Sequence, residues 1–306
     1  MRTSTRLELL VLATSLLAAG CSGDDDGGSS VLDDFDEGEI ADADDMDIWA
    51  TASAPNVFIS AYLPITLADL AREDGDCPAM TEDDTTVTYE GDCTDADGRT
   101  WIGRATTIGD MTSETASVSY EGFGFRSQED CDGDSVPSEL AWSGGIVLSS
   151  TGSALSAEID VTADGSNPGA DCEPFPTQLG IDYDLTMDDE GEANRWNGSG
   201  RVGNSLYGRV EASTEEEVVD GSVCNSEALS GTTVVTAGDD VAVVTYDGAD
   251  DCDEDSTVTW TLNGDDQGEL AGVSCAAGGG TGGGGALALL AALMVVVRRR
   301  RAVTPR

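Results

Sequence analysis

Apolar and polar residues alternate along several stretches of this chain, which is the pattern of a β-strand with one buried and one exposed face. Over residues 155–163 every odd-numbered residue is apolar and every even-numbered residue is polar, and the same alternation recurs over 181–188 and 257–262. Polar clusters at 189–192 and 263–266 separate such runs at hairpin spacing. Because this alternation is typical of antiparallel sheets, we expect an all-β fold of about a dozen short strands, as a meander, a sandwich or an open barrel.

Only one segment has helical rather than alternating spacing. Residues 65–72 have helical spacing and precede Gly75, so we expect one short helix near the N-terminal end of the folded region. The extracytoplasmic region 49–275 is long enough for one large β domain or for two small ones, in which case the break lies near residues 165–178.

A hairpin unit occurs three times along the chain. Each copy has a strand with a tyrosine followed two residues later by glycine, then an acidic loop with a cysteine, then a strand with a tryptophan. Its aromatic pairs are Tyr89 with Trp101, Tyr120 with Trp142, and Tyr246 with Trp260. We expect both rings of each pair on the core side, with the cysteine tying down the loop. The irregular spacing argues against a solenoid, which needs a fixed period.

The amino-acid composition excludes several classes of catalysis and of binding partner. The chain has 306 residues with 60 acids, 14 bases and no histidine, for a formal net charge of -46, and all the bases are arginine. Without histidine there is no Ser-His-Asp or Cys-His catalysis, and without lysine no Schiff base. A surface this negative repels phosphate backbones, so nucleic acid is excluded as a partner.

The N-terminus reads as an export signal over residues 1–20. Arg2 and Arg6 precede a short apolar stretch, and residues 17–21 have the sequence Leu-Ala-Ala-Gly-Cys. This segment resembles a bacterial lipobox, which implies that Cys21 is lipidated and becomes the first mature residue. The leucine stands one place further from the cysteine than is usual, which leaves cleavage by an ordinary signal peptidase as the alternative. The following residues, 21–48, are rich in Asp, Glu and Gly, and we expect an acidic disordered linker.

The C-terminal segment 276–306 combines a glycine-rich run, a short apolar stretch and the cluster Arg298–Arg301. Together with Cys275 it resembles the myxobacterial C-terminal sorting signal called MYXO-CTERM. The resemblance implies export to the cell surface, with Cys275 part of a signal handled by a dedicated protease. A simple tail anchor is the alternative, with the arginines on the cytoplasmic side.

The remaining six cysteines predict disulfides, because export places the chain in an oxidising compartment. Nearest-neighbour pairing gives Cys77–Cys93, Cys131–Cys172 and Cys224–Cys252, one of 15 connectivities open to six cysteines. A rival pairing joins Cys252 to Cys275 and leaves Cys224 to find another partner.

The acidic loops are the candidate metal-binding sites. Asp130, Asp132 and Asp134 occupy alternate positions and resemble the start of a calcium loop, such as those of thrombospondin type 3 repeats. Ser135 stands where the turn glycine is expected and Ala141 where a bidentate glutamate is expected, so binding would be weak. The alternative is a solvated acidic turn, and the loops at 95–98 and 251–255 match less well still.

These features predict a non-enzymatic, lipid-anchored protein of the bacterial cell surface or outer membrane, with a structural or adhesive role. We expect attachment to the membrane through the N-terminal lipid and the C-terminal tail, a surface protein or polysaccharide as partner, and no cofactor beyond weakly bound Ca²⁺. The alternative function is a carboxylate-dependent hydrolase such as a glycosidase, because that chemistry needs only two well-placed acids. The sequence nominates no catalytic pair among its 60 acids.

Overall fold

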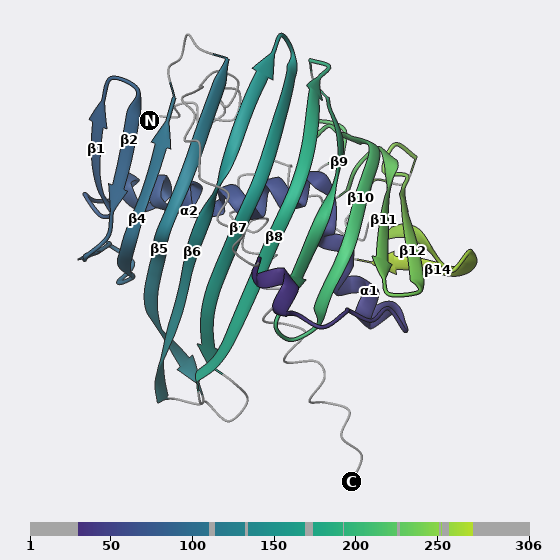
Figure 1. The fold of residues 1–306 in the computed structure, drawn as a ribbon, viewed down its shortest axis with the longest axis horizontal. Coiled ribbons are helices and arrows are strands. Elements are labelled where there is room, and N and C mark those ends of the chain that lie inside the picture. The colour runs from purple at the N-terminus through teal and green to yellow at the C-terminus, as the bar shows by residue number, and fades with distance from the viewer. Residues whose placement is uncertain are drawn as a thin grey trace, which may run out of the picture.

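The computed structural model describes residues 30–109, 114–131, 134–168, 174–191, 193–224, 227–250, 252 and 257–271. These residues form one antiparallel sheet in which strands that are consecutive along the chain lie side by side, with the short β3 paired to β4 (Figure 1). Strands β1 and β14 are the two edges and do not pair with each other, so the sheet is open. The all-β, antiparallel expectation is confirmed, and of the expected architectures the structure is a meander.

The strands follow one another in sheet order from one edge to the other. Their bounds are β1 Ala79–Asp83, β2 Thr86–Glu90, β3 Cys93–Thr94, β4 Thr100–Ile108, β5 Thr115–Cys131, β6 Asp134–Thr151, β7 Ala154–Pro168, β8 Pro174–Asp189, β9 Asn194–Asn204, β10 Gly208–Val219, β11 Ser230–Ala237, β12 Asp240–Tyr246, β13 Thr257–Leu262 and β14 Asp265–Ala271.

The alternation in the sequence corresponds to the two faces of this sheet. Ala157, Ile159 and Val161 of β7 are buried, and they lie opposite Leu185, Tyr183 and Ile181 of β8, which are buried too. The intervening polar residues of both strands point away from the core. We call the side that buries these apolar residues the inner face and the opposite side the outer face.

The middle strands are longer than expected. Strands β5 to β8 have 15 to 18 residues each, and β7 pairs with β8 from Ala154↔Asp188 to Pro168↔Pro174. The sheet therefore continues through the region around 165–178 where a break between two domains was considered, and the strand region is a single sheet.

One long helix, α2 (Ala54–Glu73), covers the inner face and crosses behind the strands in Figure 1. At 1.5 Å per residue its 20 residues span about 30 Å, close to the width of seven strand intervals of about 4.8 Å. Its contacts agree with that reach. At its start the Ala54 amide donates to Thr214 of β10, and near its end Asp69 accepts a hydrogen bond from Tyr89 of β2.

The helix expected over residues 65–72 is present as the second half of α2, but α2 begins earlier, at Ala54. Pro64 lies inside α2, and a proline usually ends or kinks a helix, so the sequence pattern favoured a start after it. Packing of the preceding turns, including the buried Val57 and Ala61, stabilises the extension. Within the described residues α2 is also the one helix long and apolar enough to cross a membrane, but 56% of that apolar window is buried in the fold. Its contacts with the sheet identify it as the core helix.

Residues 30–48, expected as part of a disordered linker, are instead ordered. They contain η1 (Val31–Asp34) and α1 (Ala43–Trp49), followed by η2 (Ala50–Ala52), and they bury Leu32, Ile40 and Met46. Part of the acidic composition has a structural use here. Asp42 caps α1 by accepting from the amides of Asp44 and Asp45, and acids in a first helical turn interact favourably with the helix dipole.

The three repeated hairpin units are arranged as expected. All six aromatic residues of the units lie on the inner face and are at most 5% exposed: Tyr89, Trp101, Tyr120, Trp142, Tyr246 and Trp260. Their register differs among the copies, because Trp142 lies opposite Phe123 whereas Trp260 lies opposite Val244. The units therefore share the placement of the rings rather than one cross-strand pair.

Two of the expected disulfides are present. Cys77 bonds to Cys93, and Cys224 bonds to Cys252, which rules out the rival pairing of Cys252 with Cys275. They close loops with sequence separations of 16 and 28 residues, for which chain entropy gives a contribution of about 3 kcal/mol each. Cys131 is disulfide-bonded as well, while its expected partner Cys172 lies outside the described residues.

Peptide mapping under non-reducing conditions tests the third bridge. We expect a linked pair of peptides containing Cys131 and Cys172, because the other described cysteines are already paired with each other. The two bridges already located act as internal controls for recovery of the peptides. A peptide linking Cys131 to Cys21 or to Cys275 would contradict the expected connectivity.

Candidate functional site

The predicted calcium loop lies at the turn between β5 and β6. Asp132 is outside the described residues, and of Asp130 and Asp134 only the backbone is described. The register pairs Asp130 with Ser135 and Cys131 with Asp134, so the two terminal acids of the motif are not cross-strand partners. Calcium binding there stays a prediction. Cys21 and Cys275, the expected lipidation and sorting residues, also lie outside the described residues.

Across the described residues, no group of three or more acidic or cysteine side chains is placed to hold a metal ion. Comparison with known protein families, with curated proteins and with solved structures finds no match.

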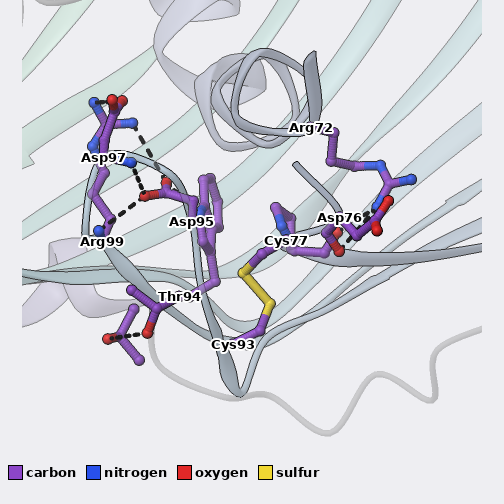
Figure 2. Close-up of a disulfide and its surroundings, with 11 residues drawn as sticks. Arg72, Asp76, Cys77, Cys93, Thr94, Asp95, Asp97 and Arg99 are labelled. Carbon is purple, nitrogen blue, oxygen red and sulfur yellow. Dashed lines mark hydrogen bonds and ion pairs between the residues drawn. A yellow bond between two sulfur atoms is a disulfide. The ribbon is translucent and has the colours of Figure 1, made fainter. Parts of the chain in front are cut away.

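The loop at 95–98, another acidic segment, has a structural role. Asp95 is 9% exposed, and one carboxylate oxygen accepts from the amides of Asp97 (3.0 Å) and Arg99 (2.9 Å). Its other oxygen accepts from the indole Nε1 of Trp101 at 2.9 Å. Figure 2 shows this loop beside the Cys77–Cys93 disulfide, which fixes the neighbouring β3. Both oxygens of Asp95 are therefore used inside the protein.

The outer face of the central strands β7 and β8 carries the most unusual arrangement of charge. In the antiparallel register Glu158 lies opposite Asp184, and Asp160 lies opposite Asp182. Like charges that face each other across two strands lower the stability of a sheet. Fold stability alone does not account for four carboxylates in two adjacent rows.

One arginine partly offsets this repulsion. Arg201 of β9 lies opposite Asp182 in the register, and its guanidinium is 2.6 Å from the Asp182 carboxylate and 2.9 Å from that of Asp33. No arginine lies opposite Glu158 or Asp184, whose other cross-strand partners are Val147 and Ser199.

These neighbouring charges affect the pKa of Asp160. Partial burial raises the pKa of this carboxyl, the neighbouring Asp182 raises it further, and Arg201 acts in the opposite direction. Protonation of Asp160 is therefore easier in the folded protein than in the unfolded chain. At neutral pH its charge works against folding.

Beyond these rows the outer face carries hydroxyl side chains and apolar residues, together with charged residues such as Arg209 and Glu211 of β10. On β9 to β13 the outer positions that carry hydroxyl groups include Ser199, Ser213, Thr232, Thr236, Thr245 and Thr259. Carboxylates and hydroxyls held in register on long paired strands form a flat polar surface that can accept and donate many hydrogen bonds. We call the carboxylate rows of β7 and β8, with this hydroxyl surface, the outer-face site.

A second polar group, which the sequence pattern does not predict, is buried on the inner face at the start of α2. Ser53 precedes the helix, and its hydroxyl donates to a carboxylate oxygen of Glu217 at 3.5 Å. Thr214 accepts from the Ala54 amide at 2.8 Å and lies 3.2 Å from the hydroxyl of Thr233. Each of these side chains is nearly inaccessible, and Glu217 is 0% exposed.

The position of Glu217 depends on a β-bulge. In strict alternation from Val210 and Ala212, residue 216 would face inward, but the register shifts after Glu215 and Glu216 adopts a φ of 53°. The extra residue brings Glu217 to the inner face. Burial raises the pKa of nearby Tyr183 to about 12, with Thr214 opposing this and Glu217 adding to it. The phenol is neutral at physiological pH.

The buried group serves to dock the helix. Thr214 supplies an acceptor for one of the amides that a helix start leaves without an intrahelical partner, and a carboxylate near that end is favoured by the helix dipole. Because Glu217 is closed off from solvent, the buried group is not open to an external partner.

We expect Asp95→Asn to lower the free energy of unfolding by about 2 kcal/mol, because an amide nitrogen in place of Oδ2 would face the buried Trp101 N–H. Asp97→Asn is the matched control. The Asp97 side chain is 66% exposed and pairs only with Arg99, so its loss should cost less than about 1 kcal/mol. Urea unfolding of the two variants measures this. Equal effects would contradict the structural role of Asp95.

For Asp160→Asn we expect greater stability than the unsubstituted protein at pH 7, by about 0.2–1 kcal/mol, the range for cross-strand charge pairs. Because the folded pKa is raised, the favourable contribution of protonated Asp160 is complete below the unfolded pKa of about 3.9 and is lost as pH rises through the folded pKa. The gain should thus vanish near pH 3.

Thermal unfolding across this pH range checks the expectation. Asp164→Asn is the control, because Asp164 is on the same strand and face but lies opposite Gln178, which donates to it. A gain for the control equal to that for Asp160→Asn would show that net charge, rather than the opposed pair, determines the effect.

Proposed function

We propose that this chain is a non-enzymatic lipoprotein of the bacterial cell surface that acts as an interaction or adhesive module through its outer-face site. The observation that carries the proposal is the opposed carboxylates of β7 and β8. Glu158 faces Asp184 and Asp160 faces Asp182 on an accessible surface, where this arrangement lowers the stability of the sheet. A partner that neutralises or hydrogen-bonds these groups would recover that cost on binding.

A surface polysaccharide fits the chemistry of the site. Carboxylates accept hydrogen bonds from sugar hydroxyls, and the Ser and Thr hydroxyls of β9 to β13 both donate and accept. The long strands hold these groups in fixed register, so many weak contacts can form together along an extended chain. The inner face is filled by α2 and the apolar core, which leaves the outer face for recognition.

Export supports the same assignment. The signal at residues 1–20, the lipobox-like segment ending at Cys21 and the C-terminal tail with Cys275 resemble the signals of surface proteins. Two disulfides in the described residues agree with an oxidising compartment. On this proposal the protein is attached to the outer membrane and displays its sheet to the cell surface.

Binding of the purified protein to surface polysaccharide from the producing bacterium tests the proposal. We expect a variant that neutralises the rows of β7 and β8 to bind at least about tenfold more weakly, equivalent to about 1.4 kcal/mol. The substitutions are Glu158→Gln, Asp160→Asn, Asp182→Asn and Asp184→Asn.

The matched control removes the same number of charges from exposed residues of the edge strands, through Glu82→Gln, Asp83→Asn, Asp265→Asn and Glu269→Gln. It should bind as the unsubstituted protein does. Equal weakening of both variants would attribute binding to net charge. Undiminished binding by the outer-face variant would contradict the site.

A further inference from the structure

Strand β1 has one regular edge with which no described strand pairs (Figure 1). On its other side β1 pairs with β2 without a bulge, from Ala79↔Glu90 to Asp83↔Thr86. All five residues of β1 are exposed. An unpaired edge of this kind is a template for one further strand. The edge of β14 is less regular, because its register shifts and Gly268 has a φ of 86°.

Hydrogen bonds on the far side of β2 show how its backbone is oriented toward β1. The amide of Gly109 donates to the carbonyl of Thr85. This bond flanks the pair Thr86↔Ile108, which makes it a pair without hydrogen bonds of its own in the β2–β4 ladder. Thr86 therefore directs its amide and carbonyl toward Asp83 of β1.

The same geometry fixes which backbone groups of β1 face outward. Pairs with and without mutual hydrogen bonds alternate along an antiparallel ladder, so Ala79, Thr81 and Asp83 bond to β2. The two residues between them, Met80 and Glu82, direct their amides and carbonyls away from the sheet. These four groups are the ones that an added strand would bond.

Two exposed apolar side chains lie beside this edge. Met80 is 38% exposed, and Leu70 near the end of α2 is 54% exposed. Both are on the inner side of the sheet edge, because Met80 lies opposite Tyr89, whose hydroxyl donates to Asp69 of α2. Apolar residues in an added strand would reduce the exposure of both.

The charge around the edge is negative. Arg72 is the one cation between residues 69 and 84, and its guanidinium donates to the carbonyls of Asp76 and Pro78 (Figure 2). The carbonyl end of a helix such as α2 also favours cations. A segment that combines positive charge with apolar residues therefore fits this edge. The exposed acids around it are Asp69, Glu73, Asp74, Asp76, Glu82, Asp83 and Asp84.

The chain itself contains a segment of this composition. Residues 295–303 read Val-Val-Val-Arg-Arg-Arg-Arg-Ala-Val and lie outside the described residues. The segment holds four of the 14 arginines and no acid, and valine is enriched in strands.

The tail is long enough to bring this segment to β1. Strand β14 ends at Ala271, and 12 strand intervals of about 4.8 Å separate it from β1, or about 58 Å. The 24 residue steps from Ala271 to Val295 span at most about 80 Å when extended. The apolar residues 286–297, by contrast, would span only about 18 Å as a helix, short of a bilayer core of about 30 Å.

We infer that residues 295–303 add to the free edge of β1 in the same molecule, as an extra strand, for as long as the chain carries its tail. The arginines then lie beside the acids of β1 and of the α2 end. Their apolar neighbours cover Met80 and Leu70. Neither lipidation of Cys21 nor binding at the outer-face site is needed for this docking.

Photo-cross-linking of the full-length protein tests the inference. Benzoylphenylalanine replaces the exposed Thr81, or Gln267 at the edge of β14 as the control. Each protein, as an equal mixture of ¹⁵N-labelled and unlabelled molecules, is reconstituted into vesicles of phosphatidylethanolamine and phosphatidylglycerol. We expect residue 81 to link to residues 295–303 within molecules of one isotope, and residue 267 to give no such link. Equal links at both edges, links between isotopes, or no link because the tail enters the bilayer would each overturn the inference.

Amide exchange distinguishes an added strand from a loose ionic contact. Substitution of all four residues Arg298–Arg301 by serine should speed exchange at the amides of Met80 and Glu82 at least about fivefold, because they lose their acceptors. The amide of Thr81, which bonds to β2, should be unchanged and serves as the internal control. Unchanged exchange at Met80 and Glu82 would contradict strand addition even if a cross-link forms.

Charge substitutions at the two edges provide a matched pair of variants. Glu82→Gln with Asp83→Asn should lower the yield of the residue 81 cross-link at least about twofold, through the loss of exposed ion pairs. Asp265→Asn with Asp266→Asn, which removes the same charge from β14, should leave the yield unchanged. Equal losses for the two variants would attribute the contact to net charge and overturn docking at β1.

Discussion

Packing of α2 against the inner face is the interaction on which the rest of the fold depends. An open sheet has an apolar face that must be covered. In a chain with this much negative charge, few apolar residues are available to cover it. One helix of 20 residues crosses the strands from β10 to β2, and beyond it η2 contacts β11 and α1 contacts β14. Tyr89 and Tyr120 of the hairpin units donate to Asp69 and to the Ala61 carbonyl of α2, and Thr214 accepts from the amide at the helix start.

Much of the sheet could be predicted from the sequence, because burial on one face leaves a direct trace in the alternation of residues. The burial of Ala157, Ile159 and Val161 and the inward rings of the three hairpin units are examples. Two disulfides were predicted from order along the chain, because in a meander neighbouring cysteines are also neighbours in space.

The parts that could not be predicted depend on contacts between distant segments. The first half of α2 was not predicted because Pro64 lies inside the helix, where a proline is unfavourable, and because the contacts that stabilise this half come from the sheet. Residues 30–38 were expected to be disordered because acids outnumber apolar residues in this segment. The order of the segment requires Gly180, Arg201 and Arg209, which lie far away in sequence. Glu217 faces inward only because of a bulge that composition does not reveal.

The two faces of the sheet have different roles. Stability comes from the inner face, where acids such as Glu217 are enclosed, and recognition is proposed for the outer face, where opposed carboxylates stay accessible. Residues 30–38 dock on the outer face before the chain enters the core at Ile40.

The most direct test of this account is amide hydrogen exchange on the full-length protein, followed by mass spectrometry of peptides from α2 and from β7 and β8. If α2 is the cover on which the sheet depends, its central amides should open only with the sheet. Their opening free energies should then agree with those of β7 and β8 within about 1 kcal/mol. Rapid exchange in α2 while β7 and β8 remain protected would contradict the account, because the sheet would then be stable without its helix.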